Sequence, residues 1–407
     1  MSIQTLRYAL RGVAAYRAVV EQPLMIRALA LLDRLAEGDA AAAAEEYARL
    51  FYQLRAEGCA SLGQWLQGQL LDRESPYAAM VEHDEADPAL EQAARQDVEV
   101  FRQLAELDCA QVLSAMEAAA PLELCPVLER LPRWQTGCPF CFEELTDFYR
   151  ANGAGIFARH RAFLWENGTL FPVEEPDCPA PDEMLGYELQ RDQVIANTRA
   201  LLAGNPVNNV LLYGDSGTGK SATVKSLLSL PGFEDLRLIE MQKEGLADMP
   251  RLIRTLGGRR PKFILFIDDL AFDQDDRTYS VMKTILEGGL ERRPANVAIY
   301  ATSNRRHLVR QTFSDRAGDE VDAFETIAEK TSLAERFGLR IPYLALNKNE
   351  FLDLVETMAA RCGVQMEREQ LRSEAGRWEM RHPGRTPRTA KQFIASLCLE
   401  QSAALGG

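Results

Sequence analysis

One octapeptide in the second half of the chain carries the clearest signal: Gly214-Asp215-Ser216-Gly217-Thr218-Gly219-Lys220-Ser221. It completes the pattern G-x-x-x-x-G-K-[ST], and it stands between an apolar run, Val210–Tyr213, and a helical stretch, Ala222–Leu230. A strand, a glycine-rich loop and a helix are the context that this pattern requires. In such a loop the backbone N–H groups surround phosphate oxygens, Lys220 reaches the β- and γ-phosphates, and Ser221 ligates Mg²⁺. The octapeptide therefore predicts a binding loop for a nucleoside triphosphate.

A second apolar run ends in two carboxylates 48 residues after Lys220. Residues 263–267 are all apolar, and Asp268 and Asp269 come next. A buried central strand of this kind would bring both carboxylates to the edge of the sheet where a nucleotide binds. We expect Asp268 to hold Mg²⁺ and Asp269 to polarise the attacking water. Taken alone, the run could also be a strand that ends in solvated acidic residues.

A polar segment follows another expected strand, Val297–Thr302, and it contains Ser303 and Asn304. A polar side chain at the end of a neighbouring strand can orient a water molecule against the γ-phosphate, which is the positioning role that phosphoryl transfer needs. We assign that role to Asn304. The alternative is an asparagine that only closes a turn.

Short β-branched or aliphatic runs alternate with helical stretches through this half of the chain. The runs are Val210–Tyr213, Leu236–Met241, Phe263–Asp268, Val297–Thr302 and Leu339–Leu344. The alternation predicts an α/β fold, a parallel sheet with crossover helices. Asn347 with Glu350 fits a capping box, and Thr386 before Pro387 fits another helix start. We expect an α/β nucleotide-binding domain at 184–346 and a small helical lid at 347–407.

Residues 1–170 are predicted to form an all-α domain, because apolar residues recur there at helical spacing, as in Leu24, Ala28 and Leu31. After them, residues 171–182 contain four prolines and four acidic residues. That composition keeps a chain extended, so we expect a linker at 171–183.

The order of these motifs resembles that of the AAA+ ATPases. It runs from the phosphate loop through Ile267-Asp268-Asp269, Ala301-Thr302-Ser303-Asn304 and Ser332–Gly338 to a helical lid that contains Arg388. The segments 208–220, 286–308 and 388–393 are similar, more narrowly, to a bacterial family of ATP-binding proteins known as domain of unknown function 815. The resemblance covers about 184–405.

The resemblance implies ATP clamped between the α/β domain and the lid, with assembly into a ring or filament. Asn304 resembles sensor 1, Arg336 an arginine finger and Arg388 sensor 2, with Arg385 as the alternative to Arg388. Most AAA+ proteins have glutamate where this chain has Asp269. The shorter side chain implies slow hydrolysis.

The two arginines and a tyrosine also have physical interpretations of their own. Arg336 precedes the last strand, so at the edge of the domain it could reach the γ-phosphate of a neighbouring subunit; a surface salt bridge with Glu335 or Glu329 is the alternative. Arg388 falls in the first turn of a helix, where the helix dipole disfavours a cation and an anionic partner is expected. Tyr187 either lines the adenine pocket or packs in the core.

Charge and composition narrow the range of partners. The net charge is −14, and residues 1–180 contribute 15 arginines, no lysine and 28 acidic residues. An acidic surface repels phosphate backbones and anionic lipids, which argues against nucleic acid or membrane binding and favours a protein partner.

No run approaches about 18 apolar residues, so no membrane span is expected. The eight dispersed cysteines, with Cys138 and Cys141 read as structural, indicate a cytoplasmic protein.

The leading hypothesis is a homo-oligomeric AAA+ protein, a slow ATPase that couples its nucleotide state to an unidentified protein partner through the N-terminal domain. One alternative is a nucleic-acid-associated loader, because Ser332–Gly338 also resembles the finger region of replication initiators. Another is a nucleotide-gated scaffold with negligible hydrolysis, which Asp269 supports.

Overall fold

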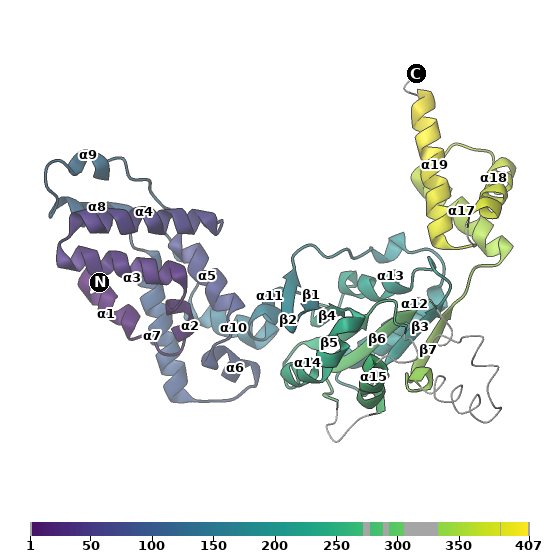
Figure 1. The fold of residues 1–407 in the computed structure, drawn as a ribbon, viewed down its shortest axis with the longest axis horizontal. Helices are drawn as coiled ribbons and strands as arrows, with labels where there is room; N and C mark the ends of the chain where they lie inside the picture. Colours follow the sequence, from purple (N-terminus) through teal and green to yellow (C-terminus); the bar gives the residue numbers. More distant parts are fainter. Residues whose placement is uncertain (1, 272–276, 288–292, 305–332, 383, 406–407) are drawn as a thin grey trace. The chain divides into compact units, whose positions relative to one another are not determined.

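The computed structural model describes residues 2–271, 277–287, 293–304, 333–382 and 384–405, and these form two compact units (Figure 1). The first unit comprises Met1–His160 with Arg259–Pro261, and the second comprises Arg161–Gly258 and Lys262–Gly407. No helix of the described residues is both long enough and apolar enough to cross a membrane.

The first unit is helical, as predicted. Its helices are α1 (Ile3–Arg11), α2 (Arg17–Val20), α3 (Pro23–Glu37), α4 (Ala40–Ala56), α5 (Leu62–Asp72), α6 (Pro76–Glu82), α7 (Pro88–Ala105), α8 (Cys109–Glu117), α9 (Cys125–Leu128), α10 (Phe142–Asn152) and α11 (Ile156–Arg159). Apolar residues from nearly all of these helices form one continuous core. Serine or aspartate side chains accept the first free N–H groups of six helices, which is why the helices start where they do.

A buried carboxylate ties residues 259–261 into the first unit. Glu82 is 5% exposed, and its oxygens accept hydrogen bonds from the backbone N–H groups of Ala154 (3.1 Å) and Arg260 (2.8 Å). The guanidinium of Arg259 lies 3.1 Å from the same carboxylate. Because three donors surround it, this buried charge is fully compensated.

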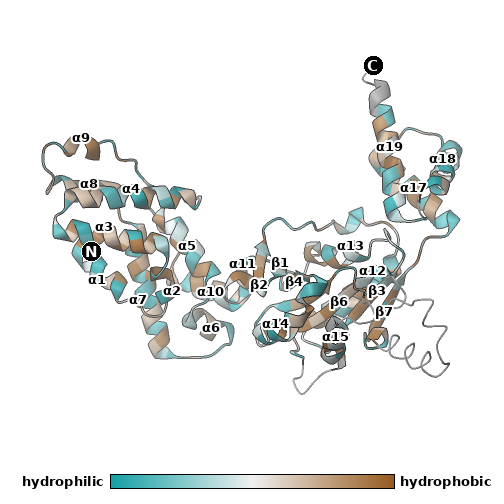
Figure 2. Ribbon diagram, in the orientation of Figure 1, coloured by the Kyte–Doolittle hydropathy of each residue, from teal (hydrophilic) through white to brown (hydrophobic). Residues whose placement is uncertain are grey.

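A seven-stranded sheet lies at the centre of the second unit. Its strands are β1 (Ala162–Glu166), β2 (Thr169–Val173), β3 (Val210–Gly214), β4 (Leu236–Met241), β5 (Lys262–Ile267), β6 (Val297–Ser303) and β7 (Leu339–Tyr343), in the spatial order β2-β1-β4-β5-β6-β3-β7. All neighbouring pairs are parallel except β1 with β2. Every residue of β6 is buried, and Figure 2 shows the central strands mostly in hydrophobic colours, as expected of a sheet covered on both faces.

Helices cover both faces of this sheet: α12 and α13 lie over one face, α14 and α15 over the other (Figure 1). The helical elements are η1 (Pro181–Glu183), α12 (Glu188–Leu202), α13 (Lys220–Lys225), η2 (Ser226–Ser229), η3 (Lys243–Asp248), α14 (Met249–Leu256) and α15 (Arg277–Glu287). After β7 come α17 (Lys348–Cys362), α18 (Arg368–Arg381) and α19 (Pro387–Leu405), which share an apolar core of their own. The expected capping box of Asn347 and Glu350 begins α17. The predicted fold class, an α/β P-loop protein with a C-terminal helical lid and a helical N-terminal part, is confirmed.

The boundary between the units differs from the expected one. The sequence analysis placed 1–170 in the helical part and 171–183 in a linker, whereas the second unit begins at Arg161 and includes the β1–β2 hairpin. Asn167 (φ 49°) and Gly168 (φ 76°) form its turn, with the positive φ angles that suit a two-residue hairpin loop. The hairpin belongs to the α/β unit because β1 pairs with β4.

Candidate nucleotide-binding site

The phosphate loop begins where β3 ends and leads directly into α13. Gly217 (φ 79°) and Gly219 (φ 95°) adopt the left-handed conformation that glycine tolerates best. A Cβ atom at Gly214 would lie only 2.2 Å from the carbonyl oxygen of Tyr343 in β7. The N–H of Asp215 donates to that same oxygen at 2.9 Å. Glycine at 214 therefore lets the loop start directly against β7.

The ammonium of Lys220 is held inside the loop. The residue is 6% exposed, and Nζ donates to the carbonyl oxygens of Gly214 (3.1 Å) and Asp215 (2.7 Å) and to Oδ1 of Asn304 (2.9 Å). Burial lowers the pKa of Lys220 below its usual value, and the carboxylates of the site oppose that shift. These three hydrogen-bond acceptors are neutral, so a phosphate oxygen would be a stronger partner for this cation.

The two acidic residues after β5 occupy different environments. Oδ1 of Asp268 accepts hydrogen bonds from the hydroxyls of Ser221 (2.6 Å) and Thr302 (2.5 Å). Asp269 has a left-handed backbone (φ 53°), and its Oδ1 accepts a hydrogen bond from Nδ2 of Asn304 at 2.8 Å. Asn304 thus contacts Lys220 and Asp269 at once.

The adjacent oxygens of Ser221 and Asp268 fit a magnesium ion. Mg²⁺ prefers hard oxygen ligands and takes only one or two from the protein, the rest coming from water and phosphate. The two predicted ligands are already within hydrogen-bonding distance of each other, so one ion could contact both.

The lid helix α19 starts against the phosphate loop. The N–H of Arg388 donates to the carbonyl oxygen of Gly217 at 3.2 Å, and a Cβ on that glycine would lie 3.0 Å from the Cβ of Arg388. Arg388 lines a cavity of about 450 Å³ together with Lys220, Asp269 and Asn304. Arg385 does not line this cavity, and its Nε lies 2.5 Å from Glu379 instead.

Three lining residues were not singled out from the sequence: Thr302, Lys391 and Gln392. Lys391 and Gln392 follow Arg388 by three and four residues, so they share one face of α19 with it. That spacing was a readable signal. The position of Thr302, two residues before Asn304 at the end of a strand, was another.

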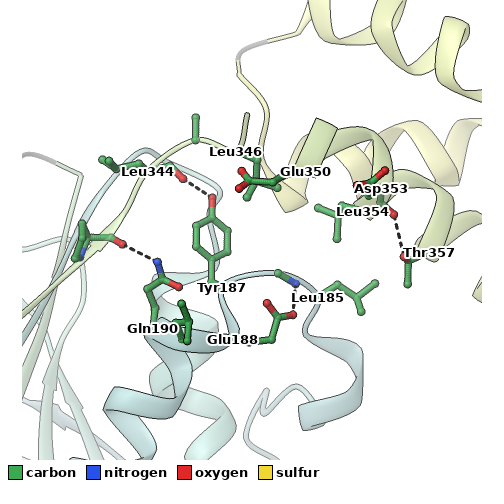
Figure 3. Close-up of a pocket in the computed structure, with 14 residues that line it drawn as sticks. Leu185, Tyr187, Glu188, Gln190, Leu344, Leu346, Glu350, Asp353, Leu354 and Thr357 are labelled. Atoms are coloured by element: carbon green, nitrogen blue, oxygen red, sulfur yellow. Dashed lines mark hydrogen bonds between the residues drawn. The ribbon is translucent and has the colours of Figure 1, made fainter. Parts of the chain in front are cut away.

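Tyr187 lies in a neighbouring cavity of about 690 Å³ (Figure 3). Its hydroxyl donates to the carbonyl oxygen of Leu344 at 2.6 Å, and its ring stacks on Tyr343 with centroids 5.0 Å apart. The hydroxyl of Tyr343 lies 3.0 Å from Oγ1 of Thr223 in α13. The Glu350 carboxylate also lines this cavity. Tyr187 is thus both a buried packing residue and a wall of a cavity.

Arg336 does not join the site within one chain. It is half-buried, in the short segment before β7, and it lines neither of the two cavities described above. Ser332, the first residue of the motif around it, lies outside the described residues, as does Glu329.

The cysteines show no sign of a metal centre. Cys141 caps α10 by accepting the N–H of Glu144 at 3.5 Å, and the thiol of Cys138 donates to the carbonyl oxygen of Phe140 at 3.2 Å. All eight cysteines are free thiols. Across the described part of the chain, no group of three or more His, Cys, Asp or Glu side chains could hold a metal ion.

Comparison with known proteins gives matches to solved structures and, separately, to one protein family. No curated protein matches the sequence. The Thermotoga maritima RuvB Holliday junction branch migration motor is a similar solved structure, with 18% identity and a TM-score of 0.36, covering 53% of this chain and 63% of that chain. A mutant of the same protein matches over the same shares with 16% identity and a TM-score of 0.36. This chain therefore spans less than two thirds of the RuvB chains.

The family match rests on the sequence and covers most of the second unit. A family model described as "Protein of unknown function (DUF815)" matches residues 158–401. The matched region starts three residues before the second unit and contains the phosphate loop, the two acidic residues, Asn304 and Arg388. Because it makes up more than half of the 407 residues, the chain belongs to the DUF815 family.

Proposed function

We propose that this chain is a cytoplasmic ATP-binding protein of the AAA+ type, a slow ATPase that couples its nucleotide state to a protein partner. One observation carries the proposal: Lys220, Asn304 and Asp269 form a continuous hydrogen-bonded series beside the Ser221–Asp268 pair. These residues come from three separate segments of the chain. Their meeting in one cavity gives each the neighbour that its proposed role requires.

Each group has a distinct task in this proposal. Lys220 exchanges its neutral acceptors for the β- and γ-phosphates, and the loop N–H groups hold the remaining phosphate oxygens. Mg²⁺ on Ser221 and Asp268 would neutralise phosphate charge. Asn304 and Asp269 would orient the attacking water once that water takes the place of their direct 2.8 Å contact. Arg388 supplies positive charge from the lid.

The adenine base is proposed to bind in the cavity beside Tyr187. Tyr343 connects this cavity to the phosphate loop in two ways: its ring stacks on Tyr187, and its carbonyl oxygen accepts the N–H of Asp215. A base bound in this cavity would therefore affect Tyr343, the residue that anchors the phosphate loop. The acidic Glu350 at the wall could accept a hydrogen bond from an exocyclic amine.

Hydrolysis is proposed to be slow because Asp269 is one methylene shorter than the glutamate expected in this position. Its carboxylate is also engaged by Asn304, which competes with a water molecule for the same oxygen. The second candidate, a nucleotide-gated scaffold with negligible hydrolysis, is favoured by this contact. The two candidates differ only in the rate of phosphate release.

Assembly and partner binding complete the proposal. Arg336 is proposed to act on the nucleotide of a neighbouring copy, since it lines neither cavity of its own chain. The acidic helical unit is proposed to bind the protein partner. Its surplus of carboxylates makes the loader alternative, which needs contact with phosphate backbones, less well supported.

Calorimetry and phosphate release test the proposal together. The wild-type protein should bind ATP in the presence of Mg²⁺, and Lys220→Ala should abolish binding. An affinity of the variant within about threefold of the wild type, roughly 0.6 kcal/mol, would remove the assignment of the loop. Phosphate release that is measurable in the wild type and lost in Asp269→Asn supports the ATPase; tight binding with no release in the wild type supports the scaffold.

A further inference from the structure

Thr302 is a residue of the site that has no role in the proposal above. It is 2% exposed at the end of β6, and its hydroxyl contacts both acidic residues after β5. Oγ1 donates to Oδ1 of Asp268 at 2.5 Å and accepts the N–H of Asp269 at 2.9 Å. Its carbonyl oxygen accepts the next N–H, that of Leu270, at 2.7 Å. The side chain and backbone of Thr302 therefore form hydrogen bonds with three consecutive residues, 268–270.

The direction of these hydrogen bonds follows from the chemistry of the groups. An ionised carboxylate can only accept, so the single hydroxyl proton of Thr302 points to Asp268. A backbone N–H can only donate, so that of Asp269 takes a lone pair of the same oxygen. Strand register places the groups together, because Ile267 pairs with Ala301 and the residues that follow stand side by side.

We propose that Thr302 is a positioning residue, which fixes the Asp268 carboxylate for Mg²⁺ and fixes the left-handed turn that aims Asp269 at the water. The inference rests on the proposed function. Asp268 accepts hydrogen bonds from two hydroxyls, and the contact with Thr302 is part-buried, whereas the contact with Ser221 is exposed to solvent. Water therefore replaces the Ser221 contact more readily than the Thr302 contact. The left-handed φ of 53° at Asp269 also needs support, since an L-residue adopts it at a cost.

A matched pair of substitutions separates the hydroxyl from the rest of the side chain. Thr302→Val keeps the shape and removes the hydroxyl, and Thr302→Ser keeps the hydroxyl and removes the methyl. Thr198→Val is the control, because Thr198 is another fully buried threonine, whose hydroxyl bonds Val194 and Tyr300 away from the site. All variants are compared as full-length chains whose melting temperature is recorded.

Two readouts are measured: ATP affinity with EDTA, and the Mg²⁺ concentration that half-saturates ATP-dependent thermal stabilisation. Thr302→Val should raise that Mg²⁺ concentration about tenfold, the effect of one lost hydrogen bond to a charged group, and leave the affinity in EDTA unchanged. Thr302→Ser should stay within about threefold of the wild type, as should Thr198→Val. Turnover, where measurable, should fall with Thr302→Val only.

The results that would contradict the role of Thr302 differ from those that would contradict the proposed function. Equal losses with and without Mg²⁺, or equal impairment of the Val and Ser variants, would overturn the proposal in favour of a packing role. Failure of the wild type to bind ATP would refute the proposed function instead. In that case amide hydrogen exchange of the peptide containing Asp269 and Leu270 still decides the matter: exchange that is faster in Thr302→Val than in Thr302→Ser supports the positioning role, and equal exchange refutes it.

Discussion

Replacing Lys220 by methionine should leave the nucleotide-free protein about as stable as the wild type. Lys220 is 6% exposed, and its ammonium donates to three neutral acceptors, each hydrogen bond of a charged group being worth about 1.5–3 kcal/mol. Removing the ammonium therefore costs about 5–9 kcal/mol of hydrogen bonding. It also removes the desolvation penalty of a buried charge, which is several kcal/mol, and methionine retains most of the alkyl packing. Because these effects oppose each other, the free energy of unfolding should change by no more than about 2 kcal/mol.

The same substitution should remove stabilisation by ATP. At a ligand concentration 100 times Kd, binding stabilises the folded state by about 2.7 kcal/mol. For a unit of this size that corresponds to a rise in melting temperature of roughly 5–11 °C. Scanning calorimetry with and without Mg²⁺–ATP measures both quantities. If Lys220→Met keeps more than half of the wild-type rise in melting temperature with ATP, the proposed contact between Lys220 and phosphate is refuted. If the free energy of unfolding without nucleotide falls by more than about 3 kcal/mol, the expected cancellation between lost hydrogen bonds and lost desolvation penalty is refuted.

The pKa of Lys220 gives this experiment a pH dependence. Burial lowers the pKa in the folded state below the usual 10.5, so over the range between the two values the unfolded chain binds more protons. The stability of the wild type should therefore rise relative to that of Lys220→Met as the pH approaches 10.5. A constant difference between pH 8 and 10.5 would contradict the lowered pKa.

Asp269→Glu should release phosphate faster than the wild type; an unchanged rate would show that side-chain length does not limit turnover. Arg336→Ala should bind ATP normally without hydrolysing it, and mixing it with Lys220→Ala should restore activity, unless sedimentation shows that the protein stays monomeric in ATP. Glu82→Ala should lower the free energy of unfolding by about 3–5 kcal/mol in urea titrations, because it removes the buried carboxylate that accepts the N–H groups of Ala154 and Arg260 and pairs with Arg259, whereas Glu37→Ala at an exposed pair should change it by less than about 0.5 kcal/mol. Fluorescence anisotropy of the full-length chain with labelled DNA and RNA at low salt should show no binding, and measurable affinity would overturn the charge argument.

The sequence by itself determined the local elements around the phosphate loop. Each predicted strand matches an observed one within about a residue at either end, because buried parallel strands are short apolar runs with clear limits. The capping box at Asn347 and the helix start at Pro387 were also readable, since capping depends on residues three positions apart. The loop itself required nothing beyond eight consecutive residues.

The β1–β2 hairpin and α18 were missed for different reasons. The Asn167-Gly168 turn was a usable hairpin signal that the helical interpretation of the preceding residues concealed. Helix α18 is short of apolar residues and buries only Leu371 and Ala375, so its periodicity is weak. The predicted boundary between the units was wrong for the same reason as the hairpin. The pairing of β1 with β4, which places the hairpin in the second unit, joins residues more than 70 positions apart.

Only the tertiary structure decided which side chains meet. The strand order places β6 between β3 and β5, so Asn304 can reach Lys220 on one side and Asp269 on the other. Likewise, the start of α19 meets Gly217, which selects Arg388 over Arg385 for the cavity. These contacts join residues 35 to 171 positions apart, and they follow from the packing of whole elements rather than from local preference. A sequence pattern specifies the end of each strand, but the neighbour of that end is set by the global arrangement of the sheet.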